Sequence, residues 1–186
     1  HTVGDVLYKG ESLKGLRPDQ VLRKGICFVP QERALFPKMT VRENMRMGGF
    51  SMSDKSDLEK RIDEIEELFP ILKERRDQHA GTMSGGQQQT LAMARTMILK
   101  PDIVMLDEPS LGLAPKIVQE MFSIMKMMAA EGITILLVEQ NALMGLKNSD
   151  QGVVLDLGRT LFSGPADDVL RDPRIQDLYL GGKKAA

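Results

Sequence analysis

The chain has 186 residues, 42% of them hydrophobic and 27% charged, which is typical of a globular protein and excludes a disordered or fibrous one. Its formal net charge of -1 gives no reason to expect nucleic acid as a partner, and its one cysteine, Cys27, cannot form an internal disulfide. The longest apolar run, residues 133–138, is much shorter than the ~18 residues that a membrane-spanning helix needs.

The first forty residues read as short elements separated by turns. A weak alternation of apolar and polar residues predicts a strand over residues 3–9. A proline near the start and a glycine at the end predict a short helix over residues 18–24. The apolar run Ile26–Val29 predicts a buried strand, and we expect Cys27 within it to be a core thiol rather than a reactive one.

Residues 40–80 have a helical character. The stretch Ser56–Glu59 matches the serine–glutamate capping box, so we expect an amphipathic helix to begin there. Four apolar residues recur at the spacing of one helix face, with charged residues between them that would face solvent: Leu58, Ile62, Ile65 and Phe69.

The second half of the chain alternates between strands and helices, an order that is typical of an open α/β sheet. Continuous apolar runs fit strands that are covered on both faces of such a sheet. The expected elements are a helix over residues 84–99, a buried strand over 103–106, a helix over 115–131, a second buried strand over 133–138, a hairpin of residues 152–156 and 159–162, and a last helix from about residue 166.

The stretch Thr82–Gln89, TMSGGQQQ, is the first candidate site. Ser84 and Gln87 fit a capping box, so one interpretation is simply a well-capped helix. Gly85 and Gly86 are poor helix formers, at about 1 kcal/mol each against alanine. Their exposed amides, the serine hydroxyl and the positive helix end instead favour an anion such as a phosphate. Because the sequence contains no G-x-x-x-x-G-K-[ST], this stretch would be one half of a nucleotide site.

The second candidate site is Asp107-Glu108, directly after the apolar run at residues 103–106. Open α/β sheets bind their ligands at the carboxyl ends of the strands. An aspartate there can hold a magnesium ion, and the adjacent glutamate can orient or deprotonate a water molecule. The alternative interpretation is a strand that ends in a charged turn.

The order of these motifs resembles the nucleotide-binding subunit of an ABC transporter over essentially the whole chain. Gln31 follows the first buried strand, Ser84–Gln87 follows the helical segment, and Leu106–Pro109 comes next. The last strand ends at Glu139-Gln140. Three further stretches resemble the ATP-binding subunits of branched-chain amino acid importers, most of all the second of the two, and are partly shared with urea and short-chain amide importers: Ser110–Pro115, Leu137–Asn141 and Tyr179–Gly182.

The resemblance implies an α/β fold with a P-loop NTPase-like (RecA-like) core, a mixed sheet and an inserted helical subdomain. The core would comprise residues 1–37 and 96–186, and the helical subdomain with the signature motif would comprise residues 38–95. The Walker A strand, loop and helix of this family normally precede the region where the printed chain begins. We therefore expect an N-terminally truncated copy that lacks roughly 30 residues or more.

The resemblance also implies two ligands, ATP and Mg2+, with each ATP sandwiched between two subunits that pair head to tail. The implied residues are Ser84, Gly85, Gly86, Gln87 and Gln31 for ATP, Asp107 and Gln31 for the metal, and Glu108 and Gln140 for hydrolysis, with Glu108 as the base. Three positions depart from many relatives: Gln140 stands in place of a histidine, Met83 in place of a leucine, and Leu113 in place of an aspartate.

The implied partners are a second ATP-binding subunit in a homo- or heterodimer, transmembrane permease subunits and, indirectly, a periplasmic or extracellular substrate-binding protein, with no nucleic acid. The implied location is peripheral, at the cytoplasmic face of the inner or plasma membrane. Two other interpretations stay open. One is a non-catalytic binding module, since the printed chain lacks a Walker A lysine. The other is an ABC ATPase of DNA repair or translation, which the single motif set disfavours.

Overall fold

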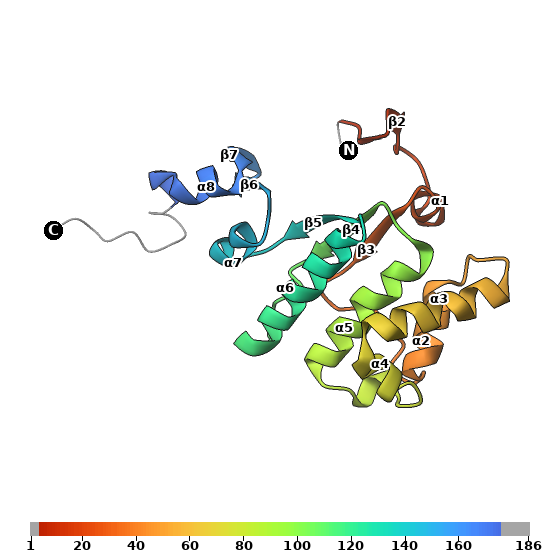
Figure 1. Cartoon of the computed structure of the whole chain (residues 1–186). Coiled ribbons are helices and arrows are strands. Elements are labelled where there is room, and N and C mark those ends of the chain that lie inside the picture. Colours follow the sequence, from red (N-terminus) through yellow and green to blue (C-terminus); the bar gives the residue numbers. More distant parts are fainter. Residues whose placement is uncertain (1–3, 176–186) are drawn as a thin grey trace. The chain divides into compact units, whose positions relative to one another are not determined.

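The computed structural model describes residues 4–175, and the chain divides into two compact units, His1–Leu136 and Leu137–Ala186 (Figure 1). Within the described residues, no helix is long and apolar enough to cross a membrane. The first unit holds β1 (Leu7–Tyr8), β2 (Glu11–Ser12), α1 (Pro18–Arg23), β3 (Ile26–Val29), α2 (Val41–Gly48), α3 (Lys55–Leu68), α4 (Pro70–Glu74), α5 (Gly85–Thr96), β4 (Ile103–Asp107), α6 (Pro115–Ala130) and the start of β5 (Thr134–Val138). The second holds α7 (Ala142–Lys147), β6 (Gln151–Asp156), β7 (Arg159–Pro165) and α8 (Ala166–Arg171).

The central sheet has the strand order β3-β4-β5, and β3 runs parallel to β4. Cys27 pairs with Val104 and Val29 with Leu106, and all four side chains are buried on one face of the sheet, where α5 packs against β3. This face confirms the predicted α/β order and the buried thiol of Cys27.

The opposite face of the sheet corrects the prediction that these strands are covered on both sides. Phe28 is 55% exposed, as are Leu136 and Val138 of β5. An apolar run predicts a buried strand because it usually has helices on both faces. Within the described part of the first unit, however, Phe28 stays exposed, whereas its neighbours Cys27 and Val29 on the other face are buried.

Helices α2, α3, α4 and α5 gather into a bundle (Figure 1). The helix over Leu58 to Phe69 is confirmed, and its residues Ile62 and Ile65 are fully buried. The predicted start at Ser56 is wrong. Asp54 is the N-cap, because its carboxylate accepts hydrogen bonds from the backbone amides of Ser56 and Asp57 at 2.7 and 3.3 Å.

The second unit is a hairpin with two short helices around a small core. Leu157 and Gly158 form the predicted turn between β6 and β7, and both have positive φ, 45° and 76°. The last helix begins at Ala166 as expected. The core residues are Leu146, Val154, Ala166, Val169 and Ile175.

Near the two ends of the chain, the structure changes one expectation and leaves another untested. Instead of one strand over residues 3–9, the structure has the antiparallel strands β1 and β2 of two residues each, in which Leu7 pairs with Ser12 and Tyr8 with Glu11. The stretch Tyr179–Gly182 lies outside the described residues. The proposed division into a core and a subdomain over residues 38–95 stays a prediction.

Candidate functional site

Two of the candidate motifs meet at one edge of the sheet. Val29, the last residue of β3, pairs with Leu106 of the parallel strand β4. Gln31 and Asp107 therefore follow neighbouring strands at their shared carboxyl edge, where α/β sheets bind ligands. Asp107 ends β4 and is half-buried, whereas Gln31 is exposed in the following turn.

Glu108 leaves the strand direction directly after Asp107. Its φ is +42°, a left-handed conformation that costs a non-glycine residue on the order of 1–3 kcal/mol. The amide of Leu111 donates to the Glu108 carbonyl at 3.1 Å and closes a turn. The chain therefore turns directly after Asp107, so that Asp107 lies in the strand and Glu108 in the turn that follows it.

The stretch at Ser84 is a capped helix start, so the capping interpretation is confirmed. The Ser84 hydroxyl accepts from the Gln87 amide at 3.3 Å, and the Gln87 side-chain oxygen accepts from the Ser84 amide at 3.1 Å. This cap does not compete with anion binding. The amides of Gly85 and Gly86 belong to the first helical turn, where an α-helix offers no internal acceptor.

The two glycines have different surroundings. A Cβ on Gly86 would lie 2.5 Å from Cγ2 of Ile117 in α6, a distance that real structures do not show. A Cβ on Gly85 would meet only ordinary contacts, 3.5 Å from the Arg33 guanidinium and 3.7 Å from Leu113. Gly86 is therefore needed for helix packing, whereas Gly85 has room for a methyl group.

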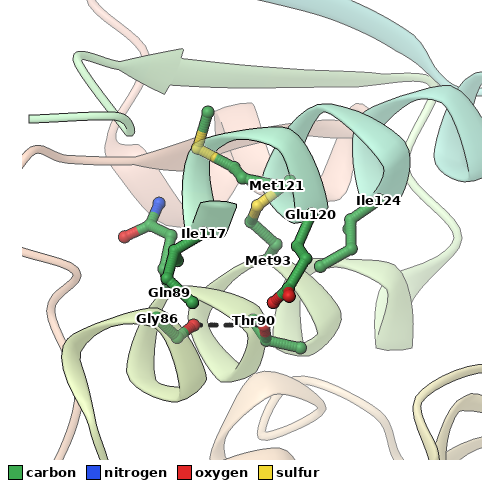
Figure 2. Close-up of a pocket in the computed structure, with 8 residues that line it drawn as sticks. All are labelled: Gly86, Gln89, Thr90, Met93, Ile117, Glu120, Met121 and Ile124. Carbon is green, nitrogen blue, oxygen red and sulfur yellow. Dashed lines mark hydrogen bonds between the residues drawn. The ribbon is translucent and has the colours of Figure 1, made fainter. Parts of the chain in front are cut away.

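Figure 2 shows the closely packed junction of α5 and α6 beside Gly86. The Thr90 hydroxyl donates to the Gly86 carbonyl at 3.1 Å. The enclosed cavity there has a volume of about 10 Å3, roughly the room for a single water molecule. A nucleotide cannot enter this space, so any phosphate must approach the exposed end of α5.

The loop that carries Gln31 is joined directly to the signature helix. Arg33 donates from Nε to the Gln89 side-chain oxygen at 3.1 Å and from Nη1 to that of Gln88 at 3.2 Å. Arg95 donates to the Ala34 carbonyl at 3.0 Å, and burial lowers the pKa of its guanidinium. Sequence reasoning missed these residues, because no spacing rule links an arginine to glutamines more than fifty positions away.

Gln140 belongs to the second unit. It follows β5, is exposed, and its carbonyl accepts from the Ala142 amide at 3.0 Å. The next residue, Asn141, caps α7 by accepting from the Met144 amide at 3.1 Å. The role of Gln140 at a phosphate stays a prediction.

The residues expected to hold a metal ion are Asp107 and Gln31. Among residues 4–175, no group of three or more His, Cys, Asp or Glu side chains could hold a metal ion by itself. Asp107 and Gln31 provide oxygen ligands at one sheet edge. This small set fits Mg2+, which takes one or two protein oxygens and completes its shell with phosphates and water.

Known proteins resemble this chain over most of its length. The sequence model of the ABC transporter family matches residues 1–111. Over 96% of its length the chain is 48% identical to the high-affinity branched-chain amino acid transport ATP-binding protein BraG of Pseudomonas aeruginosa, and it covers 76% of that protein. It is 36% identical to the probable branched-chain amino acid transport ATP-binding protein LivF of Archaeoglobus fulgidus, over 96% of the chain and 75% of that protein.

Solved structures show the same fold. An ATP-binding cassette of an ABC transporter in its ADP conformation matches with a TM-score of 0.81 and 26% identity, over 95% of this chain and 76% of that one. A nucleotide-free cassette matches with a TM-score of 0.79 over the same shares. The expected P-loop NTPase-like fold is thus confirmed, and the chain belongs to the ABC transporter family of ATP-binding, ATP-hydrolysing transport subunits.

Proposed function

We propose that this ATPase subunit powers the import of branched-chain amino acids. The observation that carries the proposal is the 48% identity to BraG over nearly the whole chain. The glutamine transport protein GlnQ of Escherichia coli is 30% identical, and the lipopolysaccharide export protein LptB of Haemophilus influenzae is 27% identical. BraG and LivF are therefore more similar to this chain than these two proteins, whereas the branched-chain amino acid transport protein BraF of Pseudomonas aeruginosa is 30% identical, as GlnQ is.

The assigned roles follow from the chemistry of each group. Glu108 accepts the proton of the attacking water, and Gln31 orients that water with its side-chain amide. Asp107 holds Mg2+, which neutralises phosphate charge when bound. Support comes from the sheet edge, where Gln31 and Asp107 follow neighbouring parallel strands.

The signature motif acts on the nucleotide of the other subunit. The Ser84 hydroxyl and the amides of Gly85 and Gly86 donate hydrogen bonds to the γ-phosphate across the interface. Gln87 holds the helix start in its capped form, as its hydrogen bonds with Ser84 indicate. Gln140 donates from its side-chain amide to the γ-phosphate of its own subunit's nucleotide and carries no charge at any pH.

The assembly that we propose has a second ATP-binding subunit in a head-to-tail dimer, docked on transmembrane permease subunits. A periplasmic or extracellular binding protein delivers the substrate to the permease, and no nucleic acid takes part. The ATPase subunits sit at the cytoplasmic face of the membrane. The similarity to BraG and LivF, which are named as transport ATP-binding proteins, supports this arrangement.

The hydrolysis test uses the complete coding region that contains these 186 residues, with Glu108→Gln against the matched control Glu131→Gln. Glu131 is exposed at the end of α6 and has no assigned role. We expect Glu108→Gln to lower magnesium-dependent ATP hydrolysis by about 100-fold or more, since loss of a general base costs 10²–10⁴-fold. Equal rates in both variants would remove the assigned role of Glu108.

The substrate test is ATP-dependent uptake by the assembled importer in vesicles. Radiolabelled leucine, isoleucine and valine are compared with urea and acetamide. Uptake of the branched-chain amino acids alone is the expected result. Uptake of urea or acetamide alone would assign the subunit to a related importer and leave the ATPase chemistry intact.

A further inference from the structure

Two arginines join the loop after β3 to the signature helix α5: Arg33 of the loop, which reaches side chains of the helix, and Arg95 of the helix, which reaches the Ala34 carbonyl of the loop. The half-buried guanidinium of Arg33 reaches two neighbouring glutamines of α5, with Nε donating to Gln89 and Nη1 to Gln88. Arginine presents these donors in a rigid planar fork, so both contacts form in one geometry. From the loop side, Arg33 is thus the side chain that connects the turn presenting Gln31 to the helix whose first turn is the signature motif.

The loop side of this contact is held in a strained conformation. Arg33 and Ala34 are consecutive non-glycine residues with φ of 62° and 47°. Such residues cost on the order of 1–3 kcal/mol each and persist only where the surroundings hold them. The Arg33 amide donates to the Pro30 carbonyl at 2.9 Å, and Arg95 donates to the Ala34 carbonyl at 3.0 Å.

The helix side of the contact is equally fixed. The Gln88 side-chain amide donates to the Ala80 carbonyl at 3.0 Å and to the Met83 carbonyl at 3.3 Å. Gln89 is only 3% exposed. Arg33 therefore binds two acceptors that cannot swing away freely. A shift of the loop must either carry α5 with it or break both of these hydrogen bonds and the one from Arg95 to Ala34.

We propose that Arg33 is a positioning residue that couples the Gln31 loop to the signature helix and thereby links the two ATP sites of the dimer. The inference rests on the proposed function, in which Gln31 meets the nucleotide of its own subunit and the signature meets that of the partner. In this proposal Arg33 acts through the loop and the helix rather than on a nucleotide, although its guanidinium lies beside Gly85, 3.5 Å from where a Cβ on that glycine would stand. Binding of ATP at one site moves the Gln31 loop, and Arg33 passes that movement to the helix that completes the other site.

The test is the dependence of hydrolysis on ATP concentration in the assembled full-length importer. Variants Arg33→Ala and Arg33→Lys are compared with the control Arg23→Ala, which removes an exposed arginine whose nearest acid, Asp19, is 3.8 Å away. We expect the Hill coefficient of Arg33→Ala to fall from above 1 towards 1, with KM within about twofold. Coupling between two sites typically changes the affinity of one site by about 5-fold or more when the other is occupied, and a change of that size alters the Hill coefficient measurably.

The remaining variants separate coupling from folding. Arg33→Lys keeps the charge but cannot bridge two glutamines, so we expect a Hill coefficient below that of the wild type. A double variant Arg33→Ala/Gln89→Leu should be no less cooperative than Arg33→Ala alone. Thermal unfolding midpoints are measured for every variant, because a purely structural role would lower the midpoint and leave the Hill coefficient unchanged.

Four results would overturn the proposal. They are a wild-type Hill coefficient of 1, an unchanged Hill coefficient in Arg33→Ala, a Hill coefficient that also falls in Arg23→Ala, and a KM raised more than about tenfold with cooperativity intact, which would make Arg33 a direct nucleotide ligand. Absence of hydrolysis in the wild type would instead refute the proposed ATPase function. The two failures are therefore distinguishable.

Discussion

The two glycines of the signature motif separate a packing role from a nucleotide role. In Gly86→Ala the new methyl group meets Cγ2 of Ile117, which is β-branched and stiff. We expect a loss of unfolding free energy of about 1–2 kcal/mol, since overpacking exceeds the gain in helix propensity. In Gly85→Ala no close contact forms, so the midpoint of urea unfolding should stay unchanged or rise.

Activity then distinguishes the two roles. Gly85→Ala should lower the rate of ATP hydrolysis on the order of 10-fold. A loss of about 1.4 kcal/mol in transition-state stabilisation at the phosphate is enough for that decrease. The double variant Gly86→Ala/Ile117→Ala should lose less stability than the sum of its single variants, because removal of Cγ2 relieves the clash. Full activity in a normally folded Gly85→Ala would contradict a close approach of phosphate to this glycine.

Cys27 gives a prediction about pH. Burial raises the pKa of its thiol to about 11 from the ordinary value of 9.0. The folded state therefore holds this proton more tightly than the unfolded state does. Its contribution to stability is complete below about pH 9 and is lost as the pH rises towards 11, a decrease on the order of 2–3 kcal/mol.

Alkylation and unfolding measurements check this prediction. Near pH 8, iodoacetamide should label native Cys27 at least about 100-fold more slowly than the urea-unfolded chain, because two pKa units lower the thiolate fraction by that factor. A Cys27→Val variant should lack the alkaline loss of stability. Rapid labelling of the native protein would contradict burial of the thiol.

At the scale of single elements, the start of α3 is the sharpest correction. The carboxylate of Asp54 accepts two backbone amides, whereas Ser56 lies inside the helix. Asp54→Ala should lower the free energy of unfolding by about 1 kcal/mol, the usual cost of losing an N-cap. Ser56→Ala is the matched control and should stay within about 0.5 kcal/mol of the wild type in urea unfolding. The reverse order would restore the sequence-based assignment.

Elements with local signals were predictable from the sequence. The helix over 115–130, the strand Ile26–Val29 and the turn at Leu157-Gly158 each depend on neighbouring residues, and the structure confirms them. The cap at Asp54 was not predictable with certainty, because Asp and Ser two positions apart offer equivalent acceptors.

At the scale of the whole molecule, the pairing of strands decides what the sequence can reveal. Gln31 and Asp107 were recognised separately, and only the parallel register of β3 and β4 brings them to one edge. The link between Arg33 and Gln88 depends on the same tertiary arrangement and leaves no periodic signal in the sequence. Burial of Phe28 was wrongly expected, because an apolar run does not reveal which face the other elements cover.

Beside the apolar core of the bundle, a buried carboxylate of α3 joins α2 and the segment that follows α4. Glu66 of α3 is 0% exposed and accepts from Arg42 of α2 at 3.1 Å and from Arg76, which follows α4, at 2.7 Å. Its other oxygen has no hydrogen-bond partner among the described residues. Arg42 also binds Asp63 at 2.9 Å, but that carboxylate is 59% exposed.

These two acids bind the same arginine and differ in burial, so they form a matched pair. Glu66→Gln should lower the free energy of unfolding by about 1.5–3 kcal/mol, because it weakens two charged hydrogen bonds where no water can replace them. Asp63→Asn should cost less than about 1 kcal/mol, since its pair is solvated, and added salt should diminish even that. Urea unfolding at low and high salt measures both. Equal, salt-sensitive losses would mean that the Glu66 contact is as solvated as the Asp63 contact, and that apolar packing alone joins the three segments.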